Sequence, residues 1–483
     1  MSGDLSKTKD QAIPLCVDLD GTLSRTDTLL EQIFWLLRKR PLKLISLIVA
    51  LAKGRVFFKK KTAEQSDFLP IHIPYNNILL EGLKKEYADG RNIYLVTGSH
   101  VDFAKKVADH LAIFKDVYGS CETNLVGKEK AKLLVETFGE KKFDYIGNAS
   151  VDIAIWKKSR KGILVKNNRF LLKKAQKFAQ VEPQFVETEI PILINIVKQI
   201  RVHQWAKNIL IFLPMILSHS YNNANTWLTC IAAMLSFAFL SSCVYLLNDV
   251  LDLEADRQHP ENKDRPFAAG SLSLVWLFIL LPLLLVLSGG LASQLSHDFI
   301  WVLGGYFALT SLYSIKLKKL PIADILMLAL LYAWRVFAGS IATGIELSNW
   351  FLTFSIFLFF SLALVKRCAE LQLLRTTTGS HNTRRGYRLD DLVLLQTFGI
   401  ASGYLSVLVL ALYLNDPMLT QQKLNPGLLW LICPLLLYWL SRLWLAAFRG
   451  NIPSDPMIFA LKDNQSYFII VLISILWLAA KGF

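Results

Sequence analysis

The chain has 483 residues, of which 53% are hydrophobic and only 19% are charged. This composition excludes an ordinary soluble protein, and the length allows two or three domains. The formal net charge of +15 could suggest nucleic-acid binding, but basic loops at an anionic leaflet explain it better, because most of the sequence after residue 200 comes in apolar runs of membrane-spanning length.

The N-terminal segment MSGDLSKTKDQ is polar and leads into a short strand, so we expect no signal peptide and a first domain that stays in the cytoplasm. The cysteines lack CxxC spacing, which fits a reducing compartment and indicates neither a metal site nor a disulfide. They are Cys16, Cys121, Cys230, Cys243, Cys368 and Cys433.

Acidic, hydroxyl and lysine side chains follow the strands predicted in residues 1–180. In PLCVDLDGTLSRTDTL, Asp18 and Asp20 end a strand over 15–19, and their spacing makes both side chains point the same way. One carboxylate could attack phosphorus while the other handles a proton, with Mg²⁺ between substrate and protein. Further polar residues follow in IYLVTGS (93–99), TNLVGKEKAKLL (123–134) and FDYIGNASVDIAIW (143–156): Thr97, Ser99, Lys128, Lys130, Gly147, Asn148 and Asp152.

Strand ends with acid, hydroxyl, lysine and acid in this order resemble the haloacid dehalogenase-like phosphohydrolases, over about residues 12–180. The resemblance implies an α/β Rossmann-like domain in which Asp18 is the nucleophile and Asp20 the general acid/base. It implies that Thr97 and Lys130, or else Lys128, bind the phosphoryl group. It also implies one Mg²⁺, held by Asp18, Asp20, Asn148 and Asp152. The family commonly has Asp directly after the last Gly, where this chain has Asn148, and Asp152 could compensate for the missing charge.

Residues 28–75 are apolar, basic and predicted to be helical, and we assign them to the cap of this domain. The run LLEQIFWLLRKRPLKLISLIVALAKGRVFFKKK has two interpretations of equal weight: helices packed on the phosphatase core, or an interfacial surface that rests on the membrane. Residues 181–195 are the predicted linker, since Pro183 and Pro191 interrupt helix there.

The remainder, 196–483, is predicted to be an all-α membrane domain of about nine transmembrane helices. The candidate spans are 196–217, 227–249, 272–292, 298–314, 322–343, 349–368, 391–415, 426–447 and 465–482. The loops alternate in their content of Lys and Arg. The loops 250–271, 315–320, 366–390 and 448–464 are rich in these residues, whereas 218–226, 293–297, 343–348 and 416–425 together contain a single one, Lys423. The positive-inside rule places the basic set in the cytoplasm and the C-terminus outside.

The segment NDVLDLEADRQHPENKDRP follows the second predicted span. Asn248, Asp252 and Asp256 share one helix face at i, i+4 and i+8. Carboxylates clustered near lipid repel one another, and a divalent cation would remove that penalty. Oxygen ligands suit Mg²⁺, which commonly bridges to substrate phosphates, and Lys263 and Arg265 could contact the remaining phosphate oxygens. The alternative is a solvated acidic helix end.

Two further polar clusters follow. In YSIKLKKLPIADILMLALLYAWRVFAG, Asp324 comes after three lysines at the start of a span, and Arg335 is about three turns deeper. An intramembrane arginine indicates a functional site, or else pairs with a buried polar group. In LVKRCAELQLLR, Lys366 and Arg367 precede Glu370 where the next span leaves the membrane, and helix-end snorkelling competes with substrate binding there.

NDxxDxxxD with the basic loop after it resembles the first Asp-rich motif of the UbiA-type intramembrane prenyltransferases, over roughly 195–483. Most members add a second DxxxD motif, but here Leu328 follows Asp324 at that spacing. With RVHQWAKN at 201–208, YSIKLKKLPIADI and LVKRCAEL, the chain resembles the polyprenyl-phosphate phosphoribosyltransferase branch. That resemblance implies Mg²⁺ and the phosphoribosyl diphosphate held by Asn248, Asp252 and Asp256, with Asp252 and Asp256 also catalytic. Asp249 either joins them as a metal ligand or supports them. The implied or candidate substrate-binding residues are Lys207, Asn248, Lys263, Arg265, Tyr313, Lys316, Lys318, Asp324, Arg335, Lys366 and Arg367.

The leading hypothesis is a bifunctional enzyme of a bacterial inner membrane, multi-pass, with both sites on the cytoplasmic side. It would transfer 5-phosphoribose from phosphoribosyl diphosphate to a polyprenyl phosphate, and the fused phosphatase would then remove the 5-phosphate. The expected partners are these two substrates and the membrane, without nucleic acid; a homo-oligomer is left open. The alternatives are an isoprenyl diphosphate-dependent transferase acting on an aromatic or other acceptor, and a transporter or anchor for a phosphatase.

Overall fold

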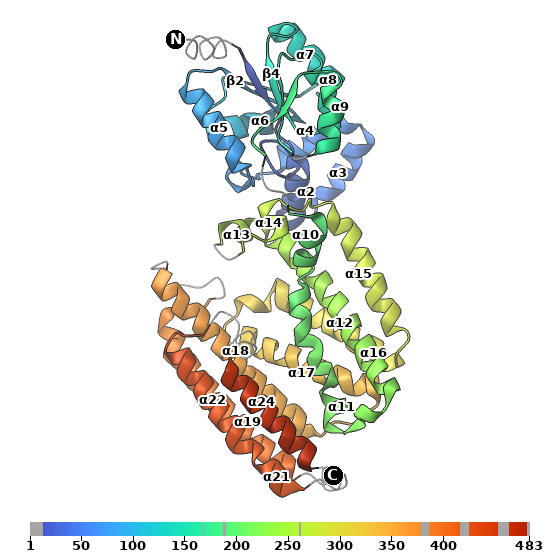
Figure 1. Cartoon of the computed structure of the whole chain (residues 1–483), viewed down its shortest axis with the longest axis vertical. Helices are drawn as coiled ribbons and strands as arrows, with labels where there is room; N and C mark the ends of the chain where they lie inside the picture. The colour runs from blue at the N-terminus through green and yellow to red at the C-terminus, as the bar shows by residue number, and fades with distance from the viewer. Residues whose placement is uncertain are drawn as a thin grey trace. The chain divides into compact units, whose positions relative to one another are not determined.

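The computed structural model describes residues 13–166, 168–186, 190–259, 262–377, 386–415, 425–452 and 463–480, without the side chains of 374–377 and 426. The chain forms two compact units (Figure 1). Unit 1 comprises Met1–Ile200 and Tyr245–Leu280, and unit 2 comprises Arg201–Val244 and Leu281–Phe483. Lys423, predicted as a loop residue, lies outside the described residues.

Unit 1 contains a six-stranded sheet in the order β3-β2-β1-β4-β5-β6, in which all paired strands are parallel. The strands are β1 (Leu15–Val17), β2 (Ile93–His100), β3 (Asp116–Ser120), β4 (Asp144–Gly147), β5 (Gly162–Leu164) and β6 (Val181–Pro183). The parallel α/β fold expected for the N-terminal half is confirmed. The chain adds strands on one side of β1 and then on the other, so the carboxyl end of β1 is the position where such sheets place ligands.

Alternate residues of β1 face opposite sides of this sheet, as the strand geometry requires. Leu15 and Val17 pack in one core with helices α5 (Asn77–Ala88) and α6 (Val101–Leu111). Cys16 packs in a second core, with helices α7 (Lys128–Phe138), α8 (Ile153–Trp156) and α9 (Arg169–Gln176). Two covered faces explain why these short strands are continuously apolar.

The residues predicted as a helical cap form three α-helices: α2 (Thr28–Lys39), α3 (Lys43–Ala52) and α4 (Arg55–Gln65), followed by the 3₁₀ turn η1 (Pro70–His72). Helix α2 begins at an N-cap, because the Asp27 carboxylate accepts hydrogen bonds from the amides of Leu29 and Leu30. Gly54, at φ 110°, allows the sharp turn between α3 and α4.

The sheet continues into the predicted linker, because β6 pairs with β5 over Val181–Pro183. Proline is tolerated there since β6 is an edge strand that needs no further donor. The helix α10 (Ile192–Gln199) follows and belongs to the same unit.

Unit 1 also includes the second segment Tyr245–Leu280, which holds the end of α12 (Ala224–Leu251), then α13 (Leu253–Gln258), α14 (Pro266–Ala269) and the start of α15 (Trp276–Ala292). Helix α2 contacts this segment: the rings of Phe34 and Phe278 stack with centroids 5.9 Å apart. Gly270 has φ +72° and packs so closely that an added Cβ would lie 2.9 Å from Arg25 Cβ. The segment Tyr245–Leu280 thus shares a unit with the α/β domain. The domain boundaries expected from the sequence stay predictions.

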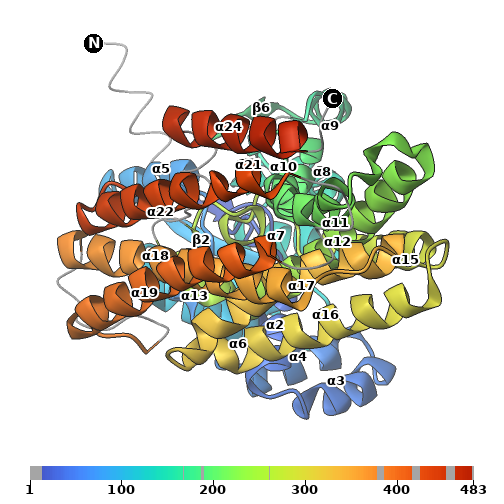
Figure 2. The ribbon, with the colours of Figure 1, turned by 90° about the horizontal axis from the view of Figure 1, so that it is seen from below.

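Unit 2 is helical. Its remaining helices include α16 (His297–Ile315), α17 (Ala323–Thr343), α18 (Asn349–Thr377), α19 (Leu392–Leu414), α21 (Pro426–Trp430), α22 (Ile432–Phe448) and α24 (Asn464–Ala480). Helix α16 packs on α17, α17 on α18, α18 on α19, α19 on α22, and α22 on α24 (Figure 2). Helices that pack in this order along the chain build the bundle.

Six helices within the described ranges are long and apolar enough to cross a membrane, and α15 and α24 are shorter apolar helices. The multi-pass character is therefore confirmed, and the count of nine remains a prediction. The first predicted span, 196–217, is instead divided into α10, the 3₁₀ helix η3 (Val202–Phe212) and α11 (Leu213–Leu217). Arg201, at φ 55°, breaks the helix before η3.

The C-terminal part of the irregular η3 segment, with Asn208, Ile211 and Phe212, is buried by protein. A Cβ added at Gly339 of α17 would lie 2.1 Å from the carbonyl oxygen of Ile211, so the two backbones are in close contact there. Irregular backbone in a membrane protein is tolerated where protein surrounds it, which explains how an apolar run can avoid a single continuous helix.

Candidate functional site

The first candidate site lies at the carboxyl ends of β1, β2 and β4. Asp18 directly follows β1, Thr97 lies in β2, and Asn148 directly follows β4, while Lys130 comes from the first turn of α7. Since β1 pairs with both β2 and β4, these ends are adjacent. The structure thus brings together the acid, hydroxyl and lysine that the sequence motifs singled out.

Lys130 contacts Asp18 directly. Its Nζ donates to Asp18 Oδ1 at 2.7 Å, to the carbonyl of Val96 at 3.2 Å and to the hydroxyl of Tyr145 at 3.1 Å. Both Lys130 and Asp18 are buried, so this ion pair is shielded from solvent.

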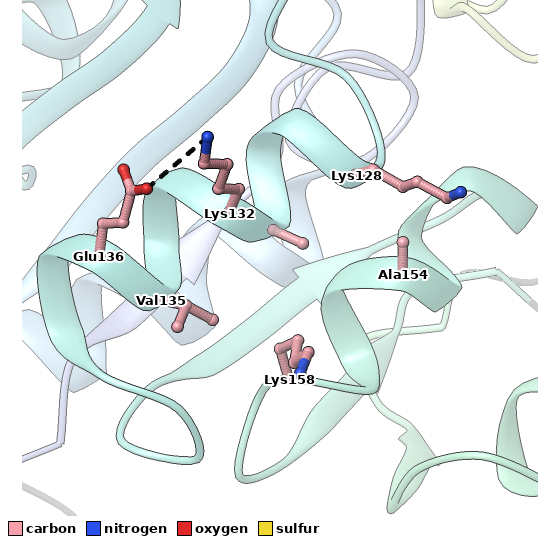
Figure 3. Close-up of a pocket in the computed structure, with 7 residues that line it drawn as sticks. Lys128, Lys132, Val135, Glu136, Ala154 and Lys158 are labelled. Atoms are coloured by element: carbon pink, nitrogen blue, oxygen red, sulfur yellow. Dashed lines mark ion pairs between the residues drawn. The ribbon is translucent and has the colours of Figure 1, made fainter.

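Lys128, the alternative lysine, is exposed and lines a surface pocket between α7 and α8. Figure 3 shows this pocket, with Lys132 and Glu136 joined by an ion pair at 4.0 Å. Of the two candidate lysines, Lys130 is the one whose geometry fits the Asp18 site.

Burial raises the pKa of Asp18 to about 7, against the lowering effect of the Lys130 charge and with further raising by the nearby Asp152 and Asp20. The environment of Asp18 therefore disfavours a free carboxylate and favours any cation that approaches it. Carboxyl groups whose pKa is shifted this far by burial and neighbouring charges are common at functional sites.

Asp20 is held by hydroxyl and amide donors. Its Oδ1 accepts from the amide and the hydroxyl of Thr28, both at 2.7 Å, and its Oδ2 accepts from Ser99 Oγ at 2.7 Å and Thr97 Oγ1 at 3.4 Å. Thr28 begins α2, so the acid is positioned by β2 and by the first helix of the predicted cap. Gly21 has φ +74°, and a Cβ there would lie 2.3 Å from Asn148 Nδ2, so only glycine fits.

Asp152, predicted as a metal ligand, organises the loop after β4. Its Oδ2 accepts from the amides of Asn148 and Ala149 at 3.0 and 2.9 Å, and its Oδ1 accepts from Tyr145 OH at 3.2 Å. Burial and the Asp152 charge raise the pKa of Tyr145 well above its usual value, so this tyrosine remains a hydrogen-bond donor. Asp18, Asp20 and Asn148 carry oxygen atoms of the kind that suits Mg²⁺. Asp152 holds the loop that carries Asn148, through its hydrogen bonds to the amides of Asn148 and Ala149.

Lys59 belongs to the same site, although the sequence did not indicate it. Its Nζ donates to the carbonyl of Gly98 at 2.6 Å and to Asn124 Oδ1 at 2.7 Å, from helix α4. Burial lowers its pKa, while the charges of Asp20 and Asp27 act in the opposite direction. The only signal was its position in the run FFKKK, which does not distinguish it from Lys60 and Lys61.

The Asp-rich segment forms a second candidate site, also in unit 1. Helix α12 ends at Leu251 and α13 begins at Leu253, with Asp252 as the N-cap between them. The amides of Asp252 and Asp256 still bond to the carbonyls four residues earlier, so the predicted common face persists through the interruption. Asn248 and Asp252 are half-buried, and Asp249 and Asp256 are buried.

Arg265, predicted to contact phosphate, bridges two of these acids. Its Nη1 lies 2.6 Å from Asp256 Oδ2 and 3.2 Å from Asp249 Oδ1. Asp249 Oδ2 also accepts from Gln199 Nε2 at 2.8 Å, and Asp256 Oδ1 accepts from Asn262 Nδ2 at 2.9 Å. Lys263 is exposed. Carboxylate and amide oxygens fit Mg²⁺ chemically, although nowhere in the described ranges do three His, Cys, Asp or Glu side chains converge on one point as a preformed metal site requires.

Unit 2 contains a buried ion pair at the cytoplasmic end predicted for two spans. Asp324, in the first turn of α17, accepts from Arg367 Nε at 2.6 Å and Nη2 at 3.1 Å, and from Tyr313 OH at 2.9 Å. Arg367, on α18, also pairs with Glu370. Arg367 is thus engaged by two carboxylates, and Asp324 occupies a buried position unlike that of an open metal ligand.

Arg335 lies deeper in α17 and is buried among polar partners. Its Nε donates to Asn208 Oδ1 at 2.8 Å, its Nη1 to the carbonyl of Leu331 at 2.6 Å and its Nη2 to Tyr306 OH at 2.7 Å. Lys207, beside Asn208 on η3, has its Nζ 5.9 Å from the ring centroid of Tyr332. These contacts match the alternative raised from the sequence, an arginine paired with buried polar groups.

The remaining predicted lysines of unit 2 differ in exposure: Lys316 is exposed, whereas Lys318 and Lys366 are half-buried.

The UbiA prenyltransferase family model matches residues 209–460. Among related proteins, the uncharacterized protein y4nM of Sinorhizobium fredii is 33% identical over 471 residues, which cover 96% of this chain and 90% of that protein. The decaprenyl-phosphate phosphoribosyltransferase of Corynebacterium glutamicum is 37% identical over 191 residues, 38% of this chain and just over half, 57%, of that enzyme. The solved structure of a UbiA homolog from Archaeoglobus fulgidus bound to DMAPP and Mg²⁺ is 16% identical, covers 59% of this chain and 98% of that one, and has a TM-score of 0.46.

Proposed function

The chain belongs to the UbiA prenyltransferase family, and from this premise we propose that its membrane domain transfers 5-phosphoribose from phosphoribosyl diphosphate to a polyprenyl phosphate. The observation that carries the proposal is the 37% identity to an enzyme named decaprenyl-phosphate phosphoribosyltransferase. The buried pairing of Asp324 with Arg367 supports it, because a second open acidic motif for an isoprenyl diphosphate is missing at that position.

In this proposal the Asp-rich segment binds the sugar donor. Asn248, Asp252 and Asp256 would hold Mg²⁺, with Asp249 beside them, and the ion would neutralise charge on the departing diphosphate. Arg265 lies among these acids already, so a phosphate oxygen could take the place of one of its carboxylate partners. The lipid phosphate is an anionic nucleophile and attacks the anomeric carbon as the bond to diphosphate breaks. A dedicated general base is therefore not required.

For the α/β domain we propose a haloacid dehalogenase-like phosphatase activity. Asp18 attacks the phosphorus of a phosphomonoester, the ester oxygen leaves with a proton from Asp20, and water then hydrolyses the phospho-aspartate with Asp20 as base. Lys130 and Thr97 would bind the phosphoryl oxygens, and Mg²⁺ at Asp18, Asp20 and Asn148 would offset their negative charge. The support is geometric: Lys130 lies 2.7 Å from Asp18, and two hydroxyls contact Asp20 from β2.

The two steps form a sequence. Transfer would yield a lipid-linked 5-phosphoribose, and removal of its 5-phosphate would yield polyprenyl-phosphate-ribose, an activated glycosyl donor. Fusion in one chain raises the local concentration of the second site for the product of the first. Both sites would lie on the cytoplasmic side of a bacterial inner membrane, as the distribution of loop charges predicts.

The donor can be identified with purified full-length protein, Mg²⁺ and a polyprenyl phosphate. We expect ribose label from phosphoribosyl diphosphate to enter the lipid fraction with wild type and with Asp264→Ala, an exposed acid of the same segment, but not with Asp252→Ala. Consumption of an isoprenyl diphosphate with no ribose label in lipid would replace this proposal with the prenyl-transfer alternative.

A further inference from the structure

Helix α3 presents an apolar face to solvent. Along Lys43–Ala52 only Leu47 and Ala50 are buried in unit 1. Leu42 is 83% exposed, Ile45 64%, Ile48 71%, and Val49 and Leu51 are each 56% exposed. Single exposed apolar residues are ordinary, but five on or next to one ten-residue helix form a contiguous patch that requires a partner.

The patch is surrounded by positive charge. Residues 33–63 contain nine Lys or Arg and no Asp or Glu. Lys39, Arg40, Lys43, Lys53, Arg55 and Lys60 are exposed. Only part of this charge is neutralised within the unit, for example by the Arg38–Glu254 and Arg40–Asp67 ion pairs.

We propose that α3 is an interfacial anchor that lies in the headgroup region of an anionic bilayer, with Ile45, Ile48 and Leu51 among the acyl chains. An apolar face bordered by lysine and arginine is what such a surface recognises, and each basic residue near the anionic headgroups strengthens the attraction. A bilayer is available, because the same chain carries membrane spans. A second copy fits the patch less well, since pairing two α3 helices would bring two strongly basic segments together.

The anchor would act on the Asp18 site. Helix α3 packs on α4, and α4 carries Lys59, which donates to the Gly98 carbonyl beside the Asp20 hydroxyl cluster. Fixing α3 in the interface would therefore hold one wall of this site at the bilayer surface, where a lipid-linked phosphoester is found. That consequence rests on the proposed phosphatase activity, whereas the anchoring itself does not.

Depth-dependent quenching tests the anchor with full-length protein in nanodiscs. In a Cys121→Ser background, which removes the exposed native thiol, an environment-sensitive fluorophore is attached at Ile48→Cys or at Phe170→Cys. Phe170, on α9, is 81% exposed and serves as the matched position outside the patch. A second label at Leu51→Cys guards against a local artefact at residue 48.

We expect nitroxide-labelled lipids to quench the labels at 48 and 51 severalfold more than the label at 170, and aqueous iodide to show the reverse order. Replacing phosphatidylglycerol by phosphatidylcholine should weaken the lipid quenching, because the basic residues lose their partners. Equal iodide access at 48 and 170 would overturn the proposal. Protection from iodide without lipid quenching would also overturn it, since a protein surface, such as a second copy, would then cover α3.

Discussion

Arg257 Nη2 lies 2.6 Å from Glu31 Oε1, so the helix that carries Asp256 is ion-paired to the helix that follows the Asp18–Asp20 motif. Arg257 Nη1 also donates to Glu31 Oε2 and to the carbonyl of His72, and Nε donates to the carbonyl of Ala268. Both side chains of the ion pair are buried. Helix α2 therefore supports the Asp-rich segment from one side, within unit 1.

Glu31→Gln should loosen the Asp-rich segment. The substitution leaves the buried Arg257 guanidinium without a carboxylate, and breaking such a pair typically costs about 3–5 kcal/mol. We expect faster hydrogen exchange over 253–259, measured by mass spectrometry on full-length protein, together with a loss of transferase activity. Asp67→Asn, which breaks the exposed Arg40–Asp67 pair, should change stability by about 1 kcal/mol at most and leave the exchange of 253–259 unchanged. Equal exchange in both variants would show that α2 does not support the segment.

Lys130→Met should abolish most phosphatase activity, by about 10²-fold or more, because it removes the cation that binds the phosphoryl group. It should also raise the pKa of Asp18 further, since the Lys130 charge opposes the effect of burial. Residual activity should then increase toward alkaline pH, as more of Asp18 becomes a carboxylate. Lys128→Met, on the surface pocket, is the matched control and should remain close to wild type. If Lys128→Met lost more phosphatase activity than Lys130→Met, Lys128 would be the lysine that binds the phosphoryl group.

Lys59→Met should raise the KM for a phosphomonoester more than it lowers kcat. Lys59 extends from α4 to the edge of the Asp20 cluster without contacting Asp18, which suits substrate binding better than the chemical step. The control is Lys60→Met, which removes the same charge from the exposed neighbouring position. A fall in kcat alone, with KM unchanged, would place Lys59 in the chemical step instead.

Arg367→Met should lower the thermal midpoint in detergent, because Asp324 would remain as a fully buried carboxylate. Adding Asp324→Leu should recover part of the loss, since the double variant no longer buries a carboxylate that has lost its guanidinium partner. Tyr313→Phe, which removes one hydrogen bond to Asp324, should lower the free energy of unfolding by only about 1 kcal/mol and so shift the midpoint less. A single variant that unfolds like wild type but no longer transfers ribose would instead identify Arg367 as a phosphate ligand.

The central features of the α/β domain could be predicted from sequence because they are local. Asp18 directly follows β1, and Thr97 lies near the carboxyl end of β2, so the two residues meet at the same sheet edge once the strands are parallel. The residue that the predicted cap adds to the Asp18 site could not be predicted from the sequence. Lys59 enters the site through the packing of α4, and nothing in a run of three lysines indicates which one points inward.

For the membrane half, the apolar segments could be predicted from the sequence, but the contacts between residues on different helices could not. Hydropathy indicates that 196–217 is apolar, yet the helix breaks at Arg201. The 3₁₀ segment after the break packs closely against Gly339 at Ile211, which is a tertiary contact that hydropathy cannot indicate. Arg335 and Asn208 are 127 residues apart, and Arg367 and Asp324 are 43 apart, so no helical period could have linked them. For the same reason Arg265 was predicted as a phosphate ligand, while its bridge between two acids was not.

The mass of the lipid product shows whether one chain carries out both steps of the proposed reaction. Full-length wild type, Asp18→Asn and Asp252→Ala would be incubated with phosphoribosyl diphosphate, Mg²⁺ and a polyprenyl phosphate, and the lipids analysed by mass spectrometry. We expect polyprenyl-phosphate-ribose from wild type, the same lipid with one additional phosphate from Asp18→Asn, and no ribosylated lipid from Asp252→Ala. A phosphorylated product that accumulates equally with wild type and Asp18→Asn would contradict the phosphatase step, and ribosylated lipid from Asp252→Ala would contradict the role of the Asp-rich segment.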